Sequence, residues 1–204
     1  MPAERIILTP EAPEEAFARC RAVIRSGGVI AYPTDTFYGL GVDPRNPRAV
    51  RRLFEIKGRS EHRPILLLIP GTDEVAAWVT SIPAPARLLM ERFWPGPLTL
   101  VFPARSDVLP ELTGGTGSIG LRVPGSDLTR SLLRFLGGGI TGTSANRTGG
   151  SAPRSADEVM DAVGDRIDLV LDGGASQATL PSTVVDAGED PPRVLRPGAV
   201  DIAV

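Results

Sequence analysis

The sequence predicts an α/β protein, in which short strands alternate with amphipathic helices around a mixed sheet. Three observations lead to this class. Residues 65–69 are apolar throughout, as in a strand that is covered on both faces. Residues 13–26 carry apolar side chains at helical spacing. Two strand candidates, 183–186 and 193–195, follow each other without a helix between them, which favours a mixed over a purely parallel sheet.

The helices are located by apolar spacing and by residues that start and stop helices. The helix over residues 13–26 meets Gly27 and Gly28, and glycine is a frequent helix stop. Asn46 can cap a helix that has Pro47 at its first position. Further helices are expected at residues 73–79, 84–93, 128–136 and 156–163.

The strand candidates are short runs of β-branched and large apolar residues bounded by Gly, Pro or polar residues. They are residues 5–8, 29–32, 65–69, 98–102, 119–123, 139–141, 169–171, 183–186 and 193–195. Because no linker, repeat or low-complexity segment interrupts this alternation, we expect one domain over residues 1–204.

Composition narrows the class of protein. Of the 204 residues 42% are hydrophobic and 23% charged, which is ordinary for a globular protein. The net charge of −2 argues against a surface that grips nucleic acid as a whole, but not against a local basic cleft. One cysteine and one histidine cannot make a zinc or iron–sulfur site, and Cys20 falls on an apolar helix face, where we expect it in the core. With no signal sequence and no membrane-length apolar run, we expect a cytoplasmic protein with no membrane contact.

Lys57 is the only lysine in the chain, since the 22 basic residues comprise 21 arginines and this one ammonium (22 − 1 = 21). Arg59 and Arg63 follow it closely. A compact ammonium beside two guanidiniums indicates a site for a polyanion such as a triphosphate. A solvated helix end, whose cations complement the helix dipole, explains the same residues. The motif alone leaves both interpretations open.

Four polar segments follow predicted strands, where open α/β sheets place their ligands. They combine hydroxyls, an amide and arginines with glycines that let a ligand approach the backbone. These segments are residues 32–41, 57–63, 142–146, and the pair 181–186 with 194–198. Each one could be an ordinary turn, but four of them in one domain predict a binding site.

Three other patterns predict no catalytic or cofactor site. Residues 115–120 match the glycine pattern of dinucleotide-binding proteins, yet they lead into a strand where that pattern needs a helix. A Ser-His-Asp triad would have to use His62, whose charged neighbours indicate an exposed loop. Residues 94–99 predict a rigid turn into a strand, with the indole of Trp94 packed on the core.

Several short motifs occur in one order between about Gly28 and Gly198. They are PTDTFYGLG, KGR, WPGPLT, GLRVP, TSANRTGG, PSTVVD and VLRPG. In these motifs and their order the chain resembles the YrdC/Sua5 family of L-threonylcarbamoyladenylate synthases. The resemblance implies an α/β fold with a twisted, mostly mixed sheet and flanking helices around a concave basic cleft. It also implies the short, single-domain type, without the C-terminal domain of the longer Sua5 form.

The resemblance implies an activity as well. Family members make L-threonylcarbamoyl-AMP from L-threonine, bicarbonate or CO2, and ATP with its Mg2+, and release pyrophosphate. The product serves the threonylcarbamoyladenosine modification of tRNA beside the anticodon. A separate threonylcarbamoyl transferase complex, the expected partner, completes that step. Weak tRNA binding by the chain itself is compatible with this role.

Site residues carry over from the family motifs by position. Lys57 and Arg59 match the pair that contacts the ATP phosphates, and we regard them as the catalytic residues. The other implied ATP contacts are Arg63, Ser118, Ser144, Asn146, Ala152 and Arg196. The implied threonine contacts are Thr36, Arg122, Gly142 and Ser182. Leu68 stands where relatives carry histidine on the threonine side.

Two other functions stay open. The arginines of the expected cleft could hold an RNA backbone in a binding module without enzymatic activity, although the acidic pI of about 5.5 and the few aromatic residues weigh against it. The second open function is that of a carbamoyltransferase of the hydrogenase-maturation type, which forms carbamoyl-adenylate. Such chains normally carry zinc-finger-like cysteines, whereas this chain has a single cysteine. No residue is an obvious general base.

Overall fold

The computed structural model describes residues 2–9, 13–60 and 63–202 of the chain. His62, considered above for a triad, lies outside the described residues. The elements in chain order are β1 (Glu4–Ile7), α1 (Pro13–Arg25), β2 (Ile30–Tyr32), β3 (Gly39–Gly41), α2 (Pro47–Lys57), β4 (Leu67–Leu68), the 3-10 helix η1 (Thr72–Ala77), α3 (Ala84–Phe93), β5 (Leu98–Pro103), α4 (Pro110–Thr113), β6 (Ser118–Arg122), α5 (Asp127–Leu136), β7 (Ile140–Thr141), β8 (Thr143–Ser144), α6 (Ala156–Val163), β9 (Leu169–Asp172), β10 (Thr183–Asp186) and β11 (Arg193–Arg196).

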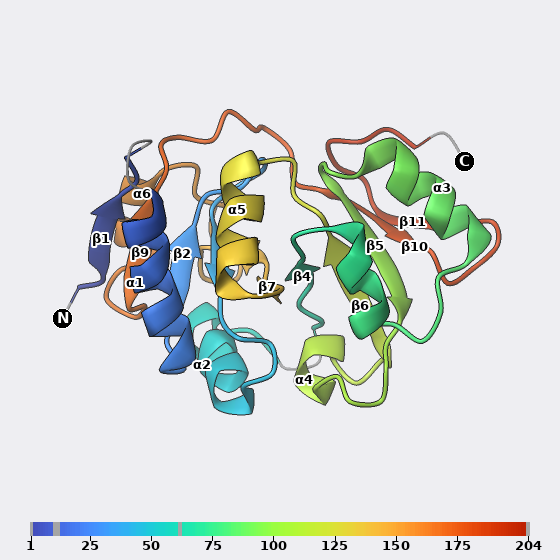
Figure 1. The fold of residues 1–204 in the computed structure, drawn as a ribbon, viewed down its shortest axis with the longest axis horizontal. Helices are drawn as coiled ribbons and strands as arrows, with labels where there is room; N and C mark the ends of the chain where they lie inside the picture. The colour runs from blue at the N-terminus through green and yellow to red at the C-terminus, as the bar shows by residue number, and fades with distance from the viewer. Residues whose placement is uncertain (1, 10–12, 61–62, 203–204) are drawn as a thin grey trace.

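Two mixed sheets organise the fold (Figure 1). A five-stranded sheet has the order β1-β9-β2-β3-β8, and a six-stranded sheet has the order β11-β10-β5-β6-β4-β7. The first pairs β1, β9 and β2 in parallel and adds β3 and β8 antiparallel. The second joins β10 to β5 and β4 to β6 in parallel, while its other pairs are antiparallel. The α/β class with mixed strands is confirmed, and the expected sheet is present as two sheets.

The two sheets meet at Thr141 and Gly142. Strand β7 belongs to the six-stranded sheet and β8 to the five-stranded one, so the chain changes sheet across one residue, Gly142. Thr141 connects this crossing to β3 and the residue after it by two hydrogen bonds. Its hydroxyl donates to the carbonyl of Leu40 at 3.1 Å and accepts from the amide of Val42 at 3.0 Å.

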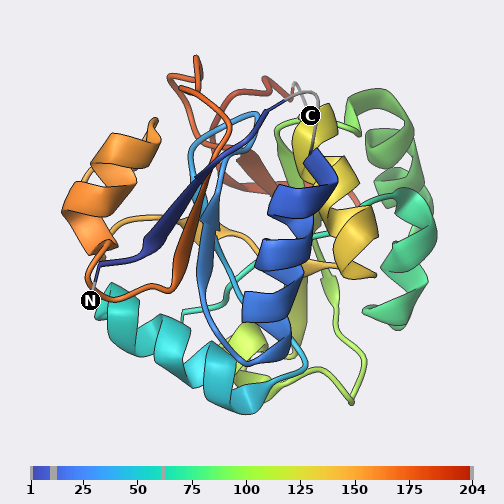
Figure 2. The same cartoon turned by 60° about the vertical axis from the view of Figure 1, so that its left-hand side comes forward.

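Helices cover the outer faces of the sheets. Figure 2 shows α1 and α5 side by side, and together they bury a core against β2 and β9 that includes Cys20 and Leu132. Cys20 is fully buried, as expected, and burial raises the pKa of its thiol to about 12. A larger core lies under α2 and α6 and continues across β5 and β6. Within the described ranges, no helix has the length and apolar character needed to cross a membrane.

Local sequence signals place most elements correctly. Asn46 caps α2 as predicted, since its Oδ1 accepts from the amides of Arg48 and Ala49 at 3.1 and 3.2 Å. The turn at Trp94 also has the predicted form, with the indole buried and its Nε1 donating to the carbonyl of Leu98 at 2.6 Å. The helix expected at residues 73–79 is instead the 3-10 helix η1.

Three short elements escape the sequence analysis: β3, β8 and α4. Strand β3 has the sequence Gly-Leu-Gly, and glycine has a low strand propensity. Its glycines are needed because the ring of Tyr32 packs against them; an ideal Cβ on Gly41 would lie 2.8 Å from Tyr32 Cε1. The strand therefore exists through contact with its neighbours, which no local pattern reports.

Candidate functional site

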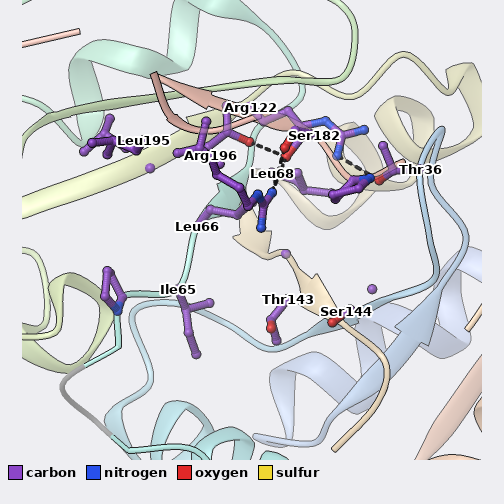
Figure 3. Close-up of a pocket in the computed structure, with 18 of the residues that line it drawn as sticks. Thr36, Ile65, Leu66, Leu68, Arg122, Thr143, Ser144, Ser182, Leu195 and Arg196 are labelled. Atoms are coloured by element: carbon purple, nitrogen blue, oxygen red, sulfur yellow. Dashed lines mark hydrogen bonds between the residues drawn. The ribbon is translucent and has the colours of Figure 1, made fainter. Parts of the chain in front are cut away.

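A pocket of about 730 Å³ receives residues from both sheets. Strands β3 and β8 contribute from the five-stranded sheet, and β4, β5, β6, β10 and β11 from the six-stranded one. Figure 3 shows Thr143 and Ser144 across the pocket from Ser182 and Arg196. All four polar segments predicted from the sequence supply residues to this one pocket, although they are far apart along the chain.

Most predicted site residues line this pocket. They are Thr36, Arg59, Ser118, Arg122, Gly142, Ser144, Ala152, Ser182 and Arg196. Leu68 lines it as well. Lys57, Arg63 and Asn146 are not among the lining residues. Their predicted contacts with ATP stay predictions.

Lys57 lies behind the wall of the pocket. Its Nζ donates to the carbonyls of Ser144 and Asn146 at 2.6 and 2.8 Å and to Asn146 Oδ1 at 3.4 Å, and the residue is 3% exposed. Burial, followed by the charge of Arg59, lowers the pKa of Lys57 to about 8. The solvated helix end considered above is therefore wrong for Lys57, because its ammonium is buried and anchors a loop.

That loop carries two of the predicted site residues. Ser144 Oγ donates to Asn146 Oδ1 at 2.6 Å, and Asn146 Nδ2 donates to the carbonyl of Gly150. The backbone of Lys57 adds a further tie, since its carbonyl accepts from the amide of Thr148 at 2.9 Å. Lys57 thus fixes the position of Ser144, which does line the pocket.

Arg59 and Arg196 bring positive charge to the pocket. Arg59 donates to the carbonyl of Pro64 at 2.8 Å, and Arg196 donates to the carbonyl and hydroxyl of Ser182 at 2.7 and 3.1 Å. Burial lowers the pKa of both guanidiniums; the nearby charges of Arg63 and Arg196 lower that of Arg59 further. Neither has a carboxylate partner among the described residues. An anion would therefore be stabilised beside them.

Arg122 differs from these two because its charge is compensated. Its guanidinium, on a side chain only 4% exposed, forms an ion pair with Asp35. Its Nε donates to the carbonyl of Gly96 at 3.0 Å and its Nη1 to Thr36 Oγ1 at 3.0 Å (Figure 3). Burial lowers the pKa of Arg122, and the carboxylate of Asp35 opposes that shift. Three bonds, two to the adjacent residues Asp35 and Thr36 and one to Gly96, hold this fork rigidly.

Several polar residues of this region were not among the predicted contacts, and Thr34, Asp35, Thr99 and Asp186 are four of them. Thr99 is 1% exposed, and its hydroxyl shares a hydrogen bond of 2.9 Å with that of Ser182. In the sequence, only the presence of a hydroxyl inside an apolar strand indicated a role for Thr99. Asp186 is the carboxylate of the lining in the described part of the chain, and its Oδ1 accepts from the amide of Gly188 at 3.0 Å. Thr34 and Asp35 lie in the first polar segment, where only their place next to Thr36 pointed to them.

The lining can hold an anion, a flat apolar group and a small polar molecule together. Apolar side chains of Ile65, Leu66, Val101, Val184 and Leu195 make up part of the wall. Apolar walls with a few placed polar groups are typical of small-molecule sites. Among the residues that the structure describes, no cluster of three His, Cys, Asp or Glu side chains could hold a metal ion.

Comparisons with known proteins agree with this fold. The family described as "Telomere recombination" (Sua5, YciO, YrdC) matches residues 22–198. The threonylcarbamoyl-AMP synthase of Thiobacillus denitrificans is 39% identical over 178 residues, covering 87% of this chain and 94% of that protein. The threonylcarbamoyl-AMP synthase of Pyrococcus abyssi is 38% identical over 180 residues, covering 88% of this chain. The chain spans only about half of the Pyrococcus protein, 53% of its length.

A solved structure extends the comparison to three dimensions. The structure of P. abyssi Sua5 complexed with L-threonine superposes with a TM-score of 0.90 at 35% identity, covering 97% of this chain and 58% of that one. The family match covers residues 22–198, which is most of the chain. The chain therefore belongs to the Sua5/YciO/YrdC family.

Proposed function

We propose that this chain makes L-threonylcarbamoyl-AMP from L-threonine, bicarbonate or CO2, and ATP as its magnesium complex, with release of pyrophosphate. The observation that carries the proposal is the division of charge in the pocket. Arg59 and Arg196 lack carboxylate partners in the described chain, whereas Arg122 has Asp35 and stands beside a threonine hydroxyl. One end suits a polyphosphate and the other a zwitterion, the two kinds of substrate that this reaction joins.

The reaction needs positive charge more than it needs a nucleophile. The amine of threonine adds to the carbon of CO2 and loses a proton, which gives a carbamate. Bicarbonate supplies the same carbon when it takes up a proton and loses water. A carbamate oxygen then attacks the α-phosphorus of ATP, and the bond to the β-phosphate breaks as pyrophosphate leaves. Attack of one anion on another is slow without cations, and phosphoryl-type transfer depends mainly on positioning and charge stabilisation.

Each group in the pocket has a task in this scheme. Arg59 and Arg196 offset the charge of the phosphates. Mg2+ carried by ATP would supply further positive charge, and Asp186, the carboxylate of the described lining, is the residue that could contact it. Arg122 holds the threonine carboxylate through its remaining N–H groups. The loop that contains Ser144 and Asn146 is held by hydrogen bonds from Lys57 to its carbonyls, and it gives the nucleotide a rigid wall. Lys57 supports this wall from behind.

The product is a reactive mixed anhydride, so another protein must consume it promptly. A transferase that carries the threonylcarbamoyl group to an adenosine of tRNA is the partner that this chemistry requires. A cytoplasmic location fits a reaction that consumes ATP and whose product is used on tRNA.

Turnover with each amino acid tests the proposal. The measurement is pyrophosphate release from ATP with bicarbonate, and the nucleotide product is identified by mass. Threonine should be required, and Arg59→Ala should lower kcat/KM for ATP by on the order of 100-fold because a charge contact to the phosphates is lost. Arg105→Ala, which removes an exposed arginine paired with Asp107, is the matched control.

Two outcomes would contradict the proposal. Equal turnover with carbamoyl phosphate and no amino acid would favour a carbamoyltransferase of the hydrogenase-maturation type. Tight binding of a defined RNA with no ATP turnover would favour an RNA-binding module.

A further inference from the structure

The hydroxyl of Thr34 determines how its neighbour Thr36 can bond. Thr34 Oγ1 lies 2.7 Å from the carbonyl oxygen of Phe37, which can only accept, so the single hydroxyl hydrogen of Thr34 is used there. The amide of Thr36 donates to the same Oγ1 at 3.0 Å. The two hydroxyls, Thr34 Oγ1 and Thr36 Oγ1, are also 3.0 Å apart. Because Thr34 has no hydrogen left, Thr36 must be the donor in this pair.

Thr36 is therefore left with acceptor capacity alone. Its one hydrogen goes to Thr34, and one of its two lone pairs accepts from Arg122 Nη1 at 3.0 Å. The remaining lone pair belongs to a residue that lines the pocket. A threonine hydroxyl usually can turn to donate or accept, but here the surrounding bonds fix its polarity. A ligand at this position must bring an N–H or O–H group.

Asp35 fixes the orientation of the Arg122 side chain, as Thr34 fixes the orientation of the Thr36 hydroxyl. A guanidinium has five N–H groups, and in the described part of the chain three of those on Arg122 are used, by Gly96, Thr36 and Asp35. The ion pair with Asp35 fixes the plane of the fork and compensates its charge in a buried place. Asp35 itself is not a lining residue, and a Cβ on Gly125 would lie 2.9 Å from its second carboxylate oxygen. Asp35 thus acts from behind Arg122.

We propose that Thr34 and Asp35 are positioning residues that make this end of the pocket a fixed donor–acceptor pair for an α-amino acid. The remaining N–H groups of Arg122 take the carboxylate, and the free lone pair of Thr36 takes an N–H of the amino group. The amino nitrogen keeps an N–H when it becomes a carbamate, so the same acceptor serves before and after that step. This inference rests on the proposed function, because it assigns the selection of its amino-acid substrate to two residues outside the implied contact set.

Three variants and one control test it. Thr34→Val removes the hydroxyl at nearly constant shape, Thr34→Ser keeps it, and Asp35→Asn removes the charge behind Arg122. Thr113→Val is the control, because Thr113 is 5% exposed and its hydroxyl also donates to a carbonyl three residues away, that of Pro110, but outside the pocket lining. The measurements are KM for threonine, KM for ATP, and calorimetric binding of L-threonine alone.

The expected pattern separates positioning from general damage. Thr34→Val and Asp35→Asn should raise KM and Kd for threonine by about tenfold, the cost of one misplaced hydrogen bond, while KM for ATP stays within about twofold. Thr34→Ser should behave like the wild type, and so should Thr113→Val. The inference is overturned if Thr34→Val binds threonine normally, or if it raises both KM values equally. A wild-type protein that binds no L-threonine would instead overturn the proposed function.

Discussion

Among the residues that the structure describes, the ammonium of Lys57 contacts three oxygens of one loop, and none of them belongs to a carboxylate. A buried cation without an opposite charge loses solvation, and this loss is what lowers the pKa of Lys57 from 10.5 to about 8. Lysine suits this place because its three N–H groups on a single atom can meet three closely spaced acceptors, whereas the planar fork of arginine spreads its donors. The chain keeps one lysine where a point charge is required.

The pKa of Lys57 predicts a pH dependence of stability. The folded protein releases this proton near pH 8 and the unfolded chain near pH 10.5, so between these values the unfolded state binds more protons and stability rises with pH. Below pH 8 Lys57 is charged in both states, and the unfolding free energy is lowered by the full cost of burying this charge. Relative to Lys57→Met, which has no group to titrate, the unfolding free energy of the wild type should gain on the order of 3 kcal/mol across this window.

Urea unfolding of both proteins at several pH values between 7 and about 11 measures this difference. Other titrating groups are common to both proteins and cancel in the comparison. A difference that stays constant through the window would mean that Lys57 titrates as it does in the unfolded chain.

At the scale of elements, the crossing from β7 to β8 determines the floor of the pocket. Gly142 is the one residue between these strands, and its backbone passes close to β4. An ideal Cβ on Gly142 would lie 2.7 Å from Leu68 Cγ and 2.8 Å from Leu66 Cδ1. Such distances are too short for two carbon atoms that are not bonded. Glycine is therefore needed here so that the backbone of residue 142 can pass close to the side chains of Leu66 and Leu68. Leu68 and Leu66 are the side chains that occupy this space.

Gly142→Ala should therefore be destabilising and should be rescued by a smaller neighbour. Overpacking of a filled core costs about 1–3 kcal/mol, and the displaced side chain of Leu68 would enter the pocket. The double variant Gly142→Ala with Leu68→Ala should recover part of the loss, giving a favourable interaction energy in a double-mutant cycle. Thermal unfolding and KM for threonine are the two measurements.

Gly188→Ala is the matched control, because the nearest atom to its ideal Cβ is at 3.4 Å and the change should be nearly neutral. Strict additivity of the Gly142 and Leu68 changes would show that the two residues do not compete for the same space.

At the scale of the whole molecule, charge is distributed unevenly. The net charge is −2, yet the pocket lining includes Arg59, Arg122, Arg193 and Arg196 against Asp186 as its described carboxylate. Arg63 and Arg147 are exposed, and Arg147 lies near the backbone of Gly58, close to the loop that Lys57 anchors. A modest basic region on an acidic protein can attract a polyanion without gripping it.

Binding of tRNA by this chain should consequently be weak and sensitive to salt. Each single-stranded phosphate that is neutralised contributes a slope of about −0.7 in log K against log salt, so a few arginines give steep loss of affinity. Fluorescence anisotropy with labelled tRNA at several salt concentrations measures the slope, and Arg63→Ala should reduce it. Arg48→Ala, an exposed arginine on α2, is the control. Tight binding that persists at high salt would contradict this prediction and would point to base-specific contacts.

Local patterns in the sequence account for much of the fold. The α/β class, the Asn46 cap, the turn at Trp94 and the buried Cys20 follow from spacing, capping and polarity within a few neighbouring residues. The same patterns locate the polar segments, because strand ends and glycines mark them. The family resemblance adds the site residues by position, and most of these line one pocket.

The tertiary structure determines what those residues can do. Lys57 and Ser144 are 87 positions apart, and Arg122 and Thr36 are 86 apart, so neither contact leaves a local signal. The division into two sheets depends on strands of two or three residues, which are too short to show a period and exist through their partners. Amino-acid types set which bonds are available, whereas burial and long-range pairing decide that Lys57 anchors a loop and that Thr36 can only accept.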